Sequence, residues 1–181
     1  LTVQAWGICS LGNNGGYFYG CSNLTLPATD SPNLASTFNL SNCFNLCSVL
    51  NVSPGLNSWN TSTITNMTST FQDAIIFNEN IGNWNVSSVT SMNAMFLRAR
   101  QFNKPIGSWV TTSLTNLVNF LFMANAFNQP LNSWDVSSVT AMSQVFYGCT
   151  VFNQPLSSWN TINTITMSGA FGLCVAFNQP L

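Results

Sequence analysis

The feature that most restricts the fold of this chain is a repeat of 25 residues, which runs without insertion through residues 55–181. A column of tryptophans and a column of phenylalanines mark it: Trp59, Trp84, Trp109, Trp134 and Trp159, and Phe77, Phe102, Phe127, Phe152 and Phe177. An Asn follows each of these phenylalanines, and columns of Met or Leu and of small residues keep the same spacing. One unit is too short to bury its own apolar residues, so successive units must stack.

The pattern within a unit predicts a repeat solenoid of leucine-rich-repeat type, with a short parallel strand and a short helix in each coil. In residues 131–136, Trp134 and Val136 alternate as in a strand whose side chains face a core. Thr65, Thr90, Thr115 and Thr140 precede a Met or Leu by two residues, which predicts helix N-caps. The Asn after each Phe is expected to form a ladder that satisfies backbone groups of the neighbouring coil.

Two regions are predicted along the chain. Residues 55–181 contain five repeats, the last of them truncated. Residues 1–54 are predicted to be degenerate, Cys-containing capping coils with inserted loops at 12–16 and 45–55, because "YFYGC" at 17–21 matches "VFYGC" at 145–149.

The composition argues against several classes of function. Charged residues make up 4% of the chain, against about 25% in typical soluble proteins, and the net charge is −1. The chain therefore lacks the cluster of basic residues that nucleic-acid-binding proteins use. No apolar run is long enough to span a membrane. The chain has no His, which removes the commonest general base and metal ligand. We expect no enzyme activity, no cofactor and no metal.

Six cysteines, an even number, permit disulfides in an oxidising compartment. Cys149 and Cys174 are one period apart, so they are expected to be neighbours at a distance compatible with a disulfide. Buried free thiols are the alternative.

Four of the seven charged residues follow the period. Asp73 and Arg98 are 25 residues apart, and so are Glu79 and Lys104. Stacked coils would place each pair side by side, at about the 4.8 Å spacing of neighbouring strands. Two ion pairs are therefore predicted between successive coils.

The sequence "FNQPLNSWDVSSVTAMSQVF" at 127–146 resembles the repeat of BspA-like surface proteins, also called the DUF285 or Mycoplasma-lipoprotein repeat. The resemblance covers about residues 55–181, and Val110 departs from it, since Asp or Asn normally follows the Trp. It implies a secreted or surface-anchored protein with leucine-rich-repeat-like coils and a role in adhesion and recognition. It implies no chemistry.

The sequence is compatible with three functions. The first is extracellular adhesion or recognition of a protein or glycan on a cell surface, through a polar face. The candidate face consists of Ser58, Asn60, Asn83, Asn85, Ser108, Ser133, Asp135, Ser158 and Asn160. The alternatives are a structural subunit that assembles with copies of itself into a filament or coat, and an ice-binding solenoid. The same residues would also be present if these polar columns were only solvated and bound no ligand.

The last coil is a candidate assembly end. "AFNQPL" at 176–181 opens a unit in two earlier places, at 126–131 and, with Val for Ala, at 151–156. We expect the coil around Phe171, Phe177 and Leu181 to be covered by more chain or by a neighbouring subunit, near its residues 1–26.

Overall fold

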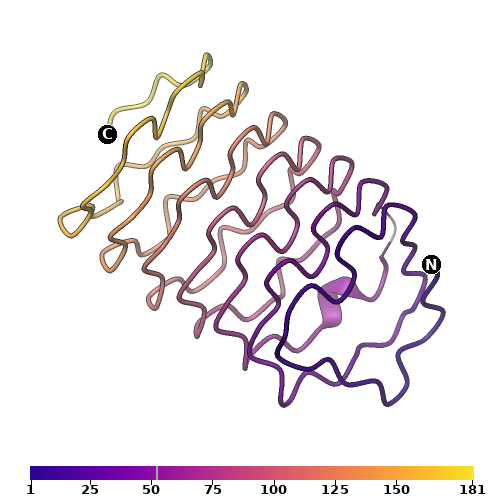
Figure 1. Ribbon diagram of the computed structural model, residues 1–181. Coiled ribbons are helices and arrows are strands. Elements are labelled where there is room, and N and C mark those ends of the chain that lie inside the picture. Colours follow the sequence, from indigo (N-terminus) through magenta and orange to yellow (C-terminus); the bar gives the residue numbers. More distant parts are fainter. Residues whose placement is uncertain (52) are drawn as a thin grey trace.

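The computed structural model describes residues 1–51 and 53–181, and within them the chain winds into coils that stack along one axis (Figure 1). The first coil lies at one end of the stack and the last coil at the other. Within these described residues, the one regular element is a short 3-10 helix, η1, at Leu56–Ser58. The predicted cap at 1–54 and its loop at 45–55 include Val52, which lies outside the described residues.

The predicted helices are wrong, because no α-helix forms in the described residues. Consecutive tight turns run through residues 67–74 in their place, and alternate amides point to different partners. The amides of Ser69 and Phe71 donate to the next coil, at Asn93 O and Met95 O (2.8 and 2.9 Å). The amides of Thr70 and Gln72, which alternate with these two, donate back to Met67 O and Ser69 O within their own coil (3.3 and 3.2 Å).

Left-handed backbone conformations explain why this segment cannot be helical. Ser69 and Asp73 have φ of 56° and 57°, which an α-helix of L-residues does not allow. The same two columns have positive φ in each later coil: Ala94, Asn119, Gln144 and Gly169, and Arg98, Met123, Gly148 and Leu173. Each left-handed residue turns the chain so that the next amide can reach the adjacent coil.

The predicted Trp strand is also wrong. The Trp134 amide donates to Leu131 O (3.1 Å), so this segment is a turn. Isolated parallel bridges occur elsewhere in the coil, linking Asn39, Asn66, Ser91, Asn116, Ala141 and Thr166 in succession. The predicted direction of the side chains is confirmed, since Trp134 and Val136 are 2% and 1% exposed.

The Thr column does not cap helices. The hydroxyl and the amide of Thr115 both donate to Thr90 O, at 3.0 and 2.9 Å. Thr140 bonds in the same way to Thr115 O. The column is therefore a ladder that runs from coil to coil.

The predicted Asn ladder is confirmed. Asn103 Oδ1 accepts from the Asn128 amide, and Asn128 Oδ1 from the Asn153 amide, at 3.0 and 2.9 Å. A Gln side chain one residue further along, such as Gln129, donates to the same oxygen (3.0 Å). A polar side chain thereby replaces a missing backbone partner between coils.

Stacked aromatic rings fill the centre of the coils. Phe71 packs on Phe77 of its own coil, with ring centroids 4.0 Å apart, and on Phe96 of the next coil at 5.6 Å. Trp109 and Trp134 stack at 6.1 Å. The Trp134 Nε1 also donates to Ile106 O (3.0 Å), so the ring contributes both apolar burial and a buried hydrogen bond.

The N-terminal residues use the same columns. The amides of Gly16 and Phe18 donate to Ser41 O and Cys43 O (2.7 and 2.9 Å). Trp6 and Phe18 are 7% and 8% exposed although they belong to the first coil. This coil therefore covers its own apolar side chains.

Replacing Trp134 with Ala should destabilise the protein by about 3–5 kcal/mol, because a buried aromatic ring and an inter-coil hydrogen bond are both lost. Thermal unfolding followed by circular dichroism measures the effect. Tyr19→Ala is the control, since this ring is 57% exposed and its loss should cost little. Similar melting temperatures for the two variants would contradict the core position of Trp134.

Candidate functional site

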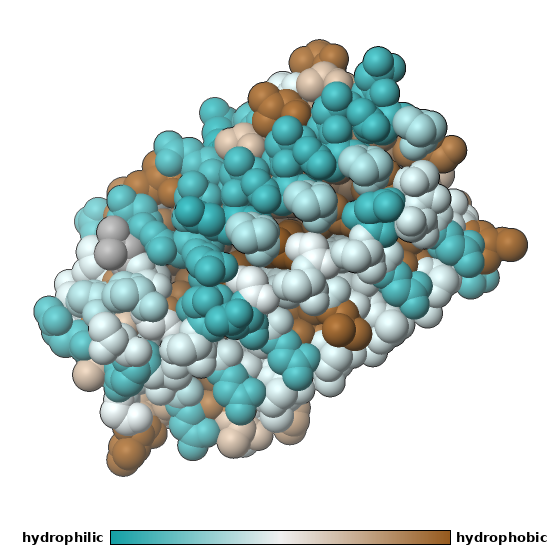
Figure 2. Space-filling view, turned by 180° about the vertical axis from the view of Figure 1, so that it is seen from behind, coloured by the Kyte–Doolittle hydropathy of each residue, from teal (hydrophilic) through white to brown (hydrophobic). Residues whose placement is uncertain are grey.

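The nine residues of the candidate face are all exposed, and they lie on the turns that surround each Trp. We call this surface the turn face. Figure 2 shows one side of the molecule, where hydrophilic side chains form rows and hydrophobic ones are scattered between them. Because the residues recur at intervals of 25 and successive coils are bridged in that register, the stack places them in columns that cross successive coils.

Four of the five Asn and Asp residues of the turn face, all except Asn83, are held by hydrogen bonds to backbone amides nearby. Asn85 Oδ1 accepts from the Ser87 amide (3.0 Å), and Asp135 Oδ1 from the Ser137 amide (2.9 Å). Asn60 and Asn160 form the same turn. Their oxygens face inward, and within the described residues the Nδ2 groups of the three asparagines have no partner. These groups are oriented donors at the surface.

The serines of the turn face bond to the neighbouring coil. The hydroxyl of Ser133 donates to Gly107 O (2.6 Å), and Ser108 reaches Gly82 O at 3.5 Å. Ser158 Oγ accepts from Asn132 Nδ2 (3.1 Å). A hydroxyl that donates inward still has lone pairs that can accept a hydrogen bond from outside.

A shallow groove of about 630 Å³ crosses this face, lined by Pro105, Gly107, Ser108, Pro130, Asn132, Ser133 and Ser158. Its volume lies within the range of about 300–1,000 Å³ that is usual for ligand sites. A Cβ on Gly107 would lie 2.6 Å from Pro130 O, so only glycine permits this close approach of coils. The lining thus combines two proline rings with three serine side chains.

Asp135 is the only charged residue of the candidate face. Hydrogen bonds from the Ser137 side chain and amide lower the pKa of its carboxyl, so it is ionised at neutral pH. The carboxyl of Asp30 also has a lowered pKa, because it accepts hydrogen bonds from the Trp6 and Gly7 amides. These hydrogen bonds link the first coil to the second.

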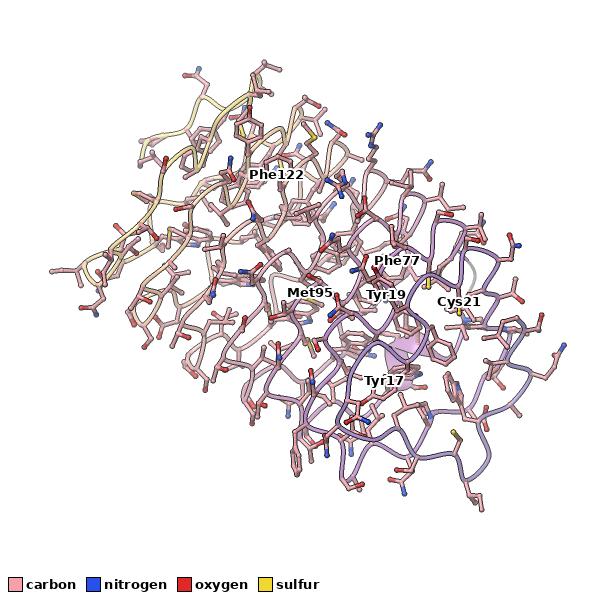
Figure 3. The ribbon with its side chains drawn as sticks, in the orientation of Figure 1. Tyr17, Tyr19, Cys21, Phe77, Met95 and Phe122 are labelled. Carbon is pink, nitrogen blue, oxygen red and sulfur yellow. The ribbon has the colours of Figure 1, made fainter. Side chains whose placement is uncertain are left out.

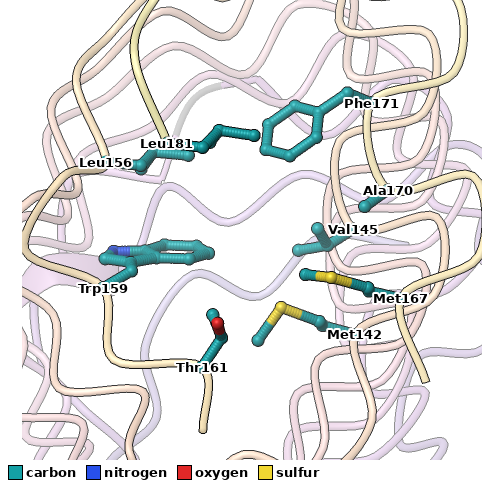
Figure 4. Close-up of a pocket in the computed structure, with 9 residues that line it drawn as sticks. All are labelled: Met142, Val145, Leu156, Trp159, Thr161, Met167, Ala170, Phe171 and Leu181. Carbon is teal, nitrogen blue, oxygen red and sulfur yellow. The ribbon is translucent and has the colours of Figure 1, made fainter. Parts of the chain in front are cut away.

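The last coil exposes apolar surface around the predicted assembly residues. Phe171 and Phe177 are partly buried, and Leu181 is 80% exposed. A cavity of about 180 Å³ opens here between the last two coils (Figure 4). It is lined by Met142, Val145, Leu156, Trp159, Thr161, Met167, Ala170, Phe171 and Leu181.

All six cysteines are free thiols, which for Cys149 and Cys174 is the alternative to a disulfide. Cys149 and Cys174 do occupy one column, and each Sγ donates to a carbonyl of the preceding coil, at Leu121 O and Phe146 O (3.1 and 2.7 Å). Burial raises the pKa of both thiols, and it raises the pKa of Cys47 to about 12. These thiols are therefore protonated and poor nucleophiles.

One of the two predicted ion pairs forms. Arg98 Nε and Nη2 donate to the two carboxylate oxygens of Asp73, at 2.5 and 2.7 Å. Glu79 and Lys104 make no salt bridge in the described part of the chain. Burial raises the pKa of Glu79, and the nearby positive charge of Lys104 opposes that rise.

The groove and the end cavity were not found from the sequence. The repetition of Pro105 and Pro130 beside the Ser column is the sequence signal that could have pointed to the groove. No helix in the described residues is long and apolar enough to cross a membrane. Nor do any three His, Cys, Asp or Glu residues there come together as metal ligands.

The comparison with protein families gives one result. The model of the Mycoplasma protein of unknown function family, DUF285, matches residues 13–129 and again 107–181. The chain belongs to this family. The two matches overlap and cover most of the sequence, including part of the N-terminal region outside the regular repeats. Searches of curated proteins and of solved structures gave no match.

Reversing the charge of Arg98 tests the stacking register. Arg98→Glu should destabilise the protein slightly, and Asp73→Arg in the same molecule should recover the loss. The coupling free energy should be about 0.5 kcal/mol, because Arg98 is 39% exposed and such pairs are weak. Chemical denaturation of the four proteins of the cycle measures it, and zero coupling would contradict this contact.

The same pair predicts a pH dependence. Arg98 lowers the pKa of Asp73 in the folded protein. The stabilisation that the ion pair gives the folded state is therefore complete above the pKa of Asp73 in the unfolded chain, about 4. It is lost as the pH falls through the lower pKa of the folded state. The Arg98→Gln variant should lack this component when unfolding is compared at pH 6 and at successively lower pH.

Proposed function

We propose that this chain is a non-enzymatic extracellular recognition module that binds a neutral glycan on a cell surface through its turn face. The groove formed by Pro105, Pro130 and the serines at 108, 133 and 158 is the observation that carries the proposal. In this proposal the stacked coils act as a leucine-rich-repeat-like solenoid, a scaffold that presents an extended surface.

The chemistry of the turn face suits a ligand rich in hydroxyl groups. Asn60, Asn85 and Asn160 present Nδ2 donors whose orientation is fixed by the turn. Ser133 presents an acceptor because its proton is used by Gly107 O. Side chains that are already ordered lose little conformational entropy on binding. The proline rings supply apolar contacts for the C–H faces of a sugar.

The low charge supports a neutral ligand. The whole chain carries three basic and four acidic residues, and the candidate face contains one of them, Asp135. Hydrogen bonds in place of ion pairs would make binding insensitive to salt. The resemblance of the repeat to surface proteins supports the extracellular placement.

Blocking the groove should abolish glycan binding. Ser133→Arg places a long cationic side chain in the groove that Pro105 and Pro130 also line, and signals on a glycan array that the parent protein gives should disappear. Gln101→Arg is the matched control, since this exposed residue is not among those that line the groove. Equal loss with both variants would contradict the groove as the site.

Absence of any glycan signal from the parent protein would overturn the proposal. Capture of a cell-surface protein, sensitive to the same Ser133→Arg change, would then support the protein-ligand alternative. Thermal hysteresis of a protein solution would support the ice-binding alternative.

Replacing Asp135 with Asn should leave the melting temperature nearly unchanged, because Asn occupies this column at 60, 85 and 160 and forms the same turn. Binding of a neutral glycan should also be retained. Loss of binding in the Asn variant would show that the ligand is recognised through a charge.

A further inference from the structure

Four of the six cysteines share one column of the stack. The amides of Cys21 and Cys47 each donate to the carbonyl three residues earlier, at Phe18 O and Phe44 O (3.0 and 3.1 Å). The same column continues through Ala74, Ala99, Ala124, Cys149 and Cys174. Each cysteine of the column therefore has another in a neighbouring coil, and alanine fills the coils between the two pairs. A small side chain suffices at this position, so the pairing of the cysteines needs a further explanation.

The register between neighbouring coils places Cys21 beside Cys47. The amide of Gly20 donates to Asn45 O (2.8 Å), which aligns the residues on either side of this bond. Figure 3 shows Cys21 among the N-terminal coils. Neighbouring coils lie about 4.8 Å apart, and a disulfide requires a Cα separation of about 4.4–6.8 Å. The backbone positions of the pair thus suit a disulfide.

The Cys47 thiol is directed toward the coil that holds Cys21. Its Sγ donates to Phe18 O (3.1 Å), and the same oxygen accepts from the Cys21 amide. One carbonyl therefore contacts both residues of the pair. After burial, the nearness of Cys21 is the next cause that raises the pKa of Cys47 to about 12.

The same contact occurs at the second pair. Cys174 Sγ donates to Phe146 O (2.7 Å), which also accepts from the Cys149 amide (2.9 Å). Between Cys149 and the coil before it, Leu121 O accepts from Cys149 Sγ and from the amide of Ala124. Each of these thiols contacts the preceding coil, but only within a pair does that coil offer a sulfur.

We propose that Cys21 and Cys47 form a disulfide between neighbouring coils when the chain folds in an oxidising medium that contains a low-molecular-weight disulfide. The structure shows the reduced form, in which all six cysteines are thiols. The bond is a covalent modification of the cysteine column and not of the turn face. This inference therefore goes beyond the proposed glycan binding and does not rest on it.

Two thiol–disulfide exchange steps make the bond. The Cys21 thiolate attacks one sulfur of the small disulfide and forms a mixed disulfide, while the other sulfur leaves as a thiolate. The Cys47 thiolate then attacks the Cys21 sulfur and releases the second small thiolate. Two protein thiols lose two protons, which the two small thiolates take up. One protein disulfide is thus formed, and one small disulfide is reduced to two thiols.

Burial determines when these steps occur. The thiolate is the form that attacks a disulfide, and Cys47 in the folded protein is 0% exposed and has a raised pKa. In the unfolded chain a cysteine has its ordinary pKa of about 8.5. The bond therefore forms while the coils assemble, and the completed stack hinders it.

Oxidative refolding followed by peptide mapping tests the bond. Two substitutions first remove the second pair: Cys149→Ala and Cys174→Ala. The protein is refolded with reduced and oxidised glutathione, and free thiols are then alkylated in denaturant. Chymotrypsin, which cuts after residues such as Phe44, separates the four remaining cysteines. Mass spectrometry should find Cys21 and Cys47 in one disulfide-linked peptide pair, and Cys9 and Cys43 alkylated.

Thermal unfolding with and without a reductant measures the effect of the bond. The cross-link closes the chain between positions 21 and 47 and restricts the unfolded state, so the oxidised protein should melt about 5–10 °C above its reduced form. Cys47→Ala should remove this difference. Cys43→Ala is the matched control and should keep it, because Cys43 is also 0% exposed but lies outside the column.

Refolding that yields no disulfide, or a main product that joins another pair of cysteines, would overturn the proposal. So would a melting temperature that the reductant lowers equally in the Cys47→Ala and Cys43→Ala variants. Circular dichroism under reducing conditions confirms that each variant is folded, which separates loss of the bond from loss of the stack.

Discussion

Backbone hydrogen bonding between coils is the constraint on which the rest of the structure depends. A coil without a helix or a continuous strand cannot satisfy its buried amides alone, and leaving them unpaired is costly. Here alternate amides, such as those of Ser69 and Phe71, find their acceptors in the next coil. Each acceptor must therefore recur at a fixed distance along the chain, because one inserted residue would shift the whole row of donors. This explains why the period of 25 residues holds without slippage.

Stacking in register also determines the surface. A residue type that recurs at each period lies about 4.8 Å from its copies, and like charges at that distance repel. Neutral polar side chains avoid this cost and can bond along their own column, as the Asn and Thr ladders do. The one ion pair in the part of the chain that the structure describes joins unlike residues of a single column, Asp73 and Arg98. The 4% content of charged residues is thus a consequence of the architecture.

Much of the stack could be predicted from the sequence because the period reports spatial neighbours directly. The inward direction of Trp134, the Asn ladder and the Asp73–Arg98 contact all follow from it. The local backbone could not be predicted in this way. Met67 and Phe71 are four residues apart, which suits a helix, yet two turns with left-handed residues at 69 and 73 place them on the same side. Gly148 and Gly169 lie in these two columns, and a glycine in every coil would have indicated left-handed backbone there. The other positions of the columns are not glycine, so the sequence did not reveal these turns. The groove depends on how neighbouring turns approach, and periodicity alone does not describe that.

Any specificity of the turn face must come from positions where a column changes. Identical coils would present an identical surface along the whole stack, and no ligand could then be placed at one site. The groove lies where two such changes meet. Asn80 gives way to proline at 105, and glycine at 107 gives way to Asn132. Gly107 admits the Pro130 carbonyl, and Asn132 then reaches the hydroxyl of Ser158. A few substitutions within a strict repeat can therefore create a local site without disturbing the hydrogen bonds that hold the coils together.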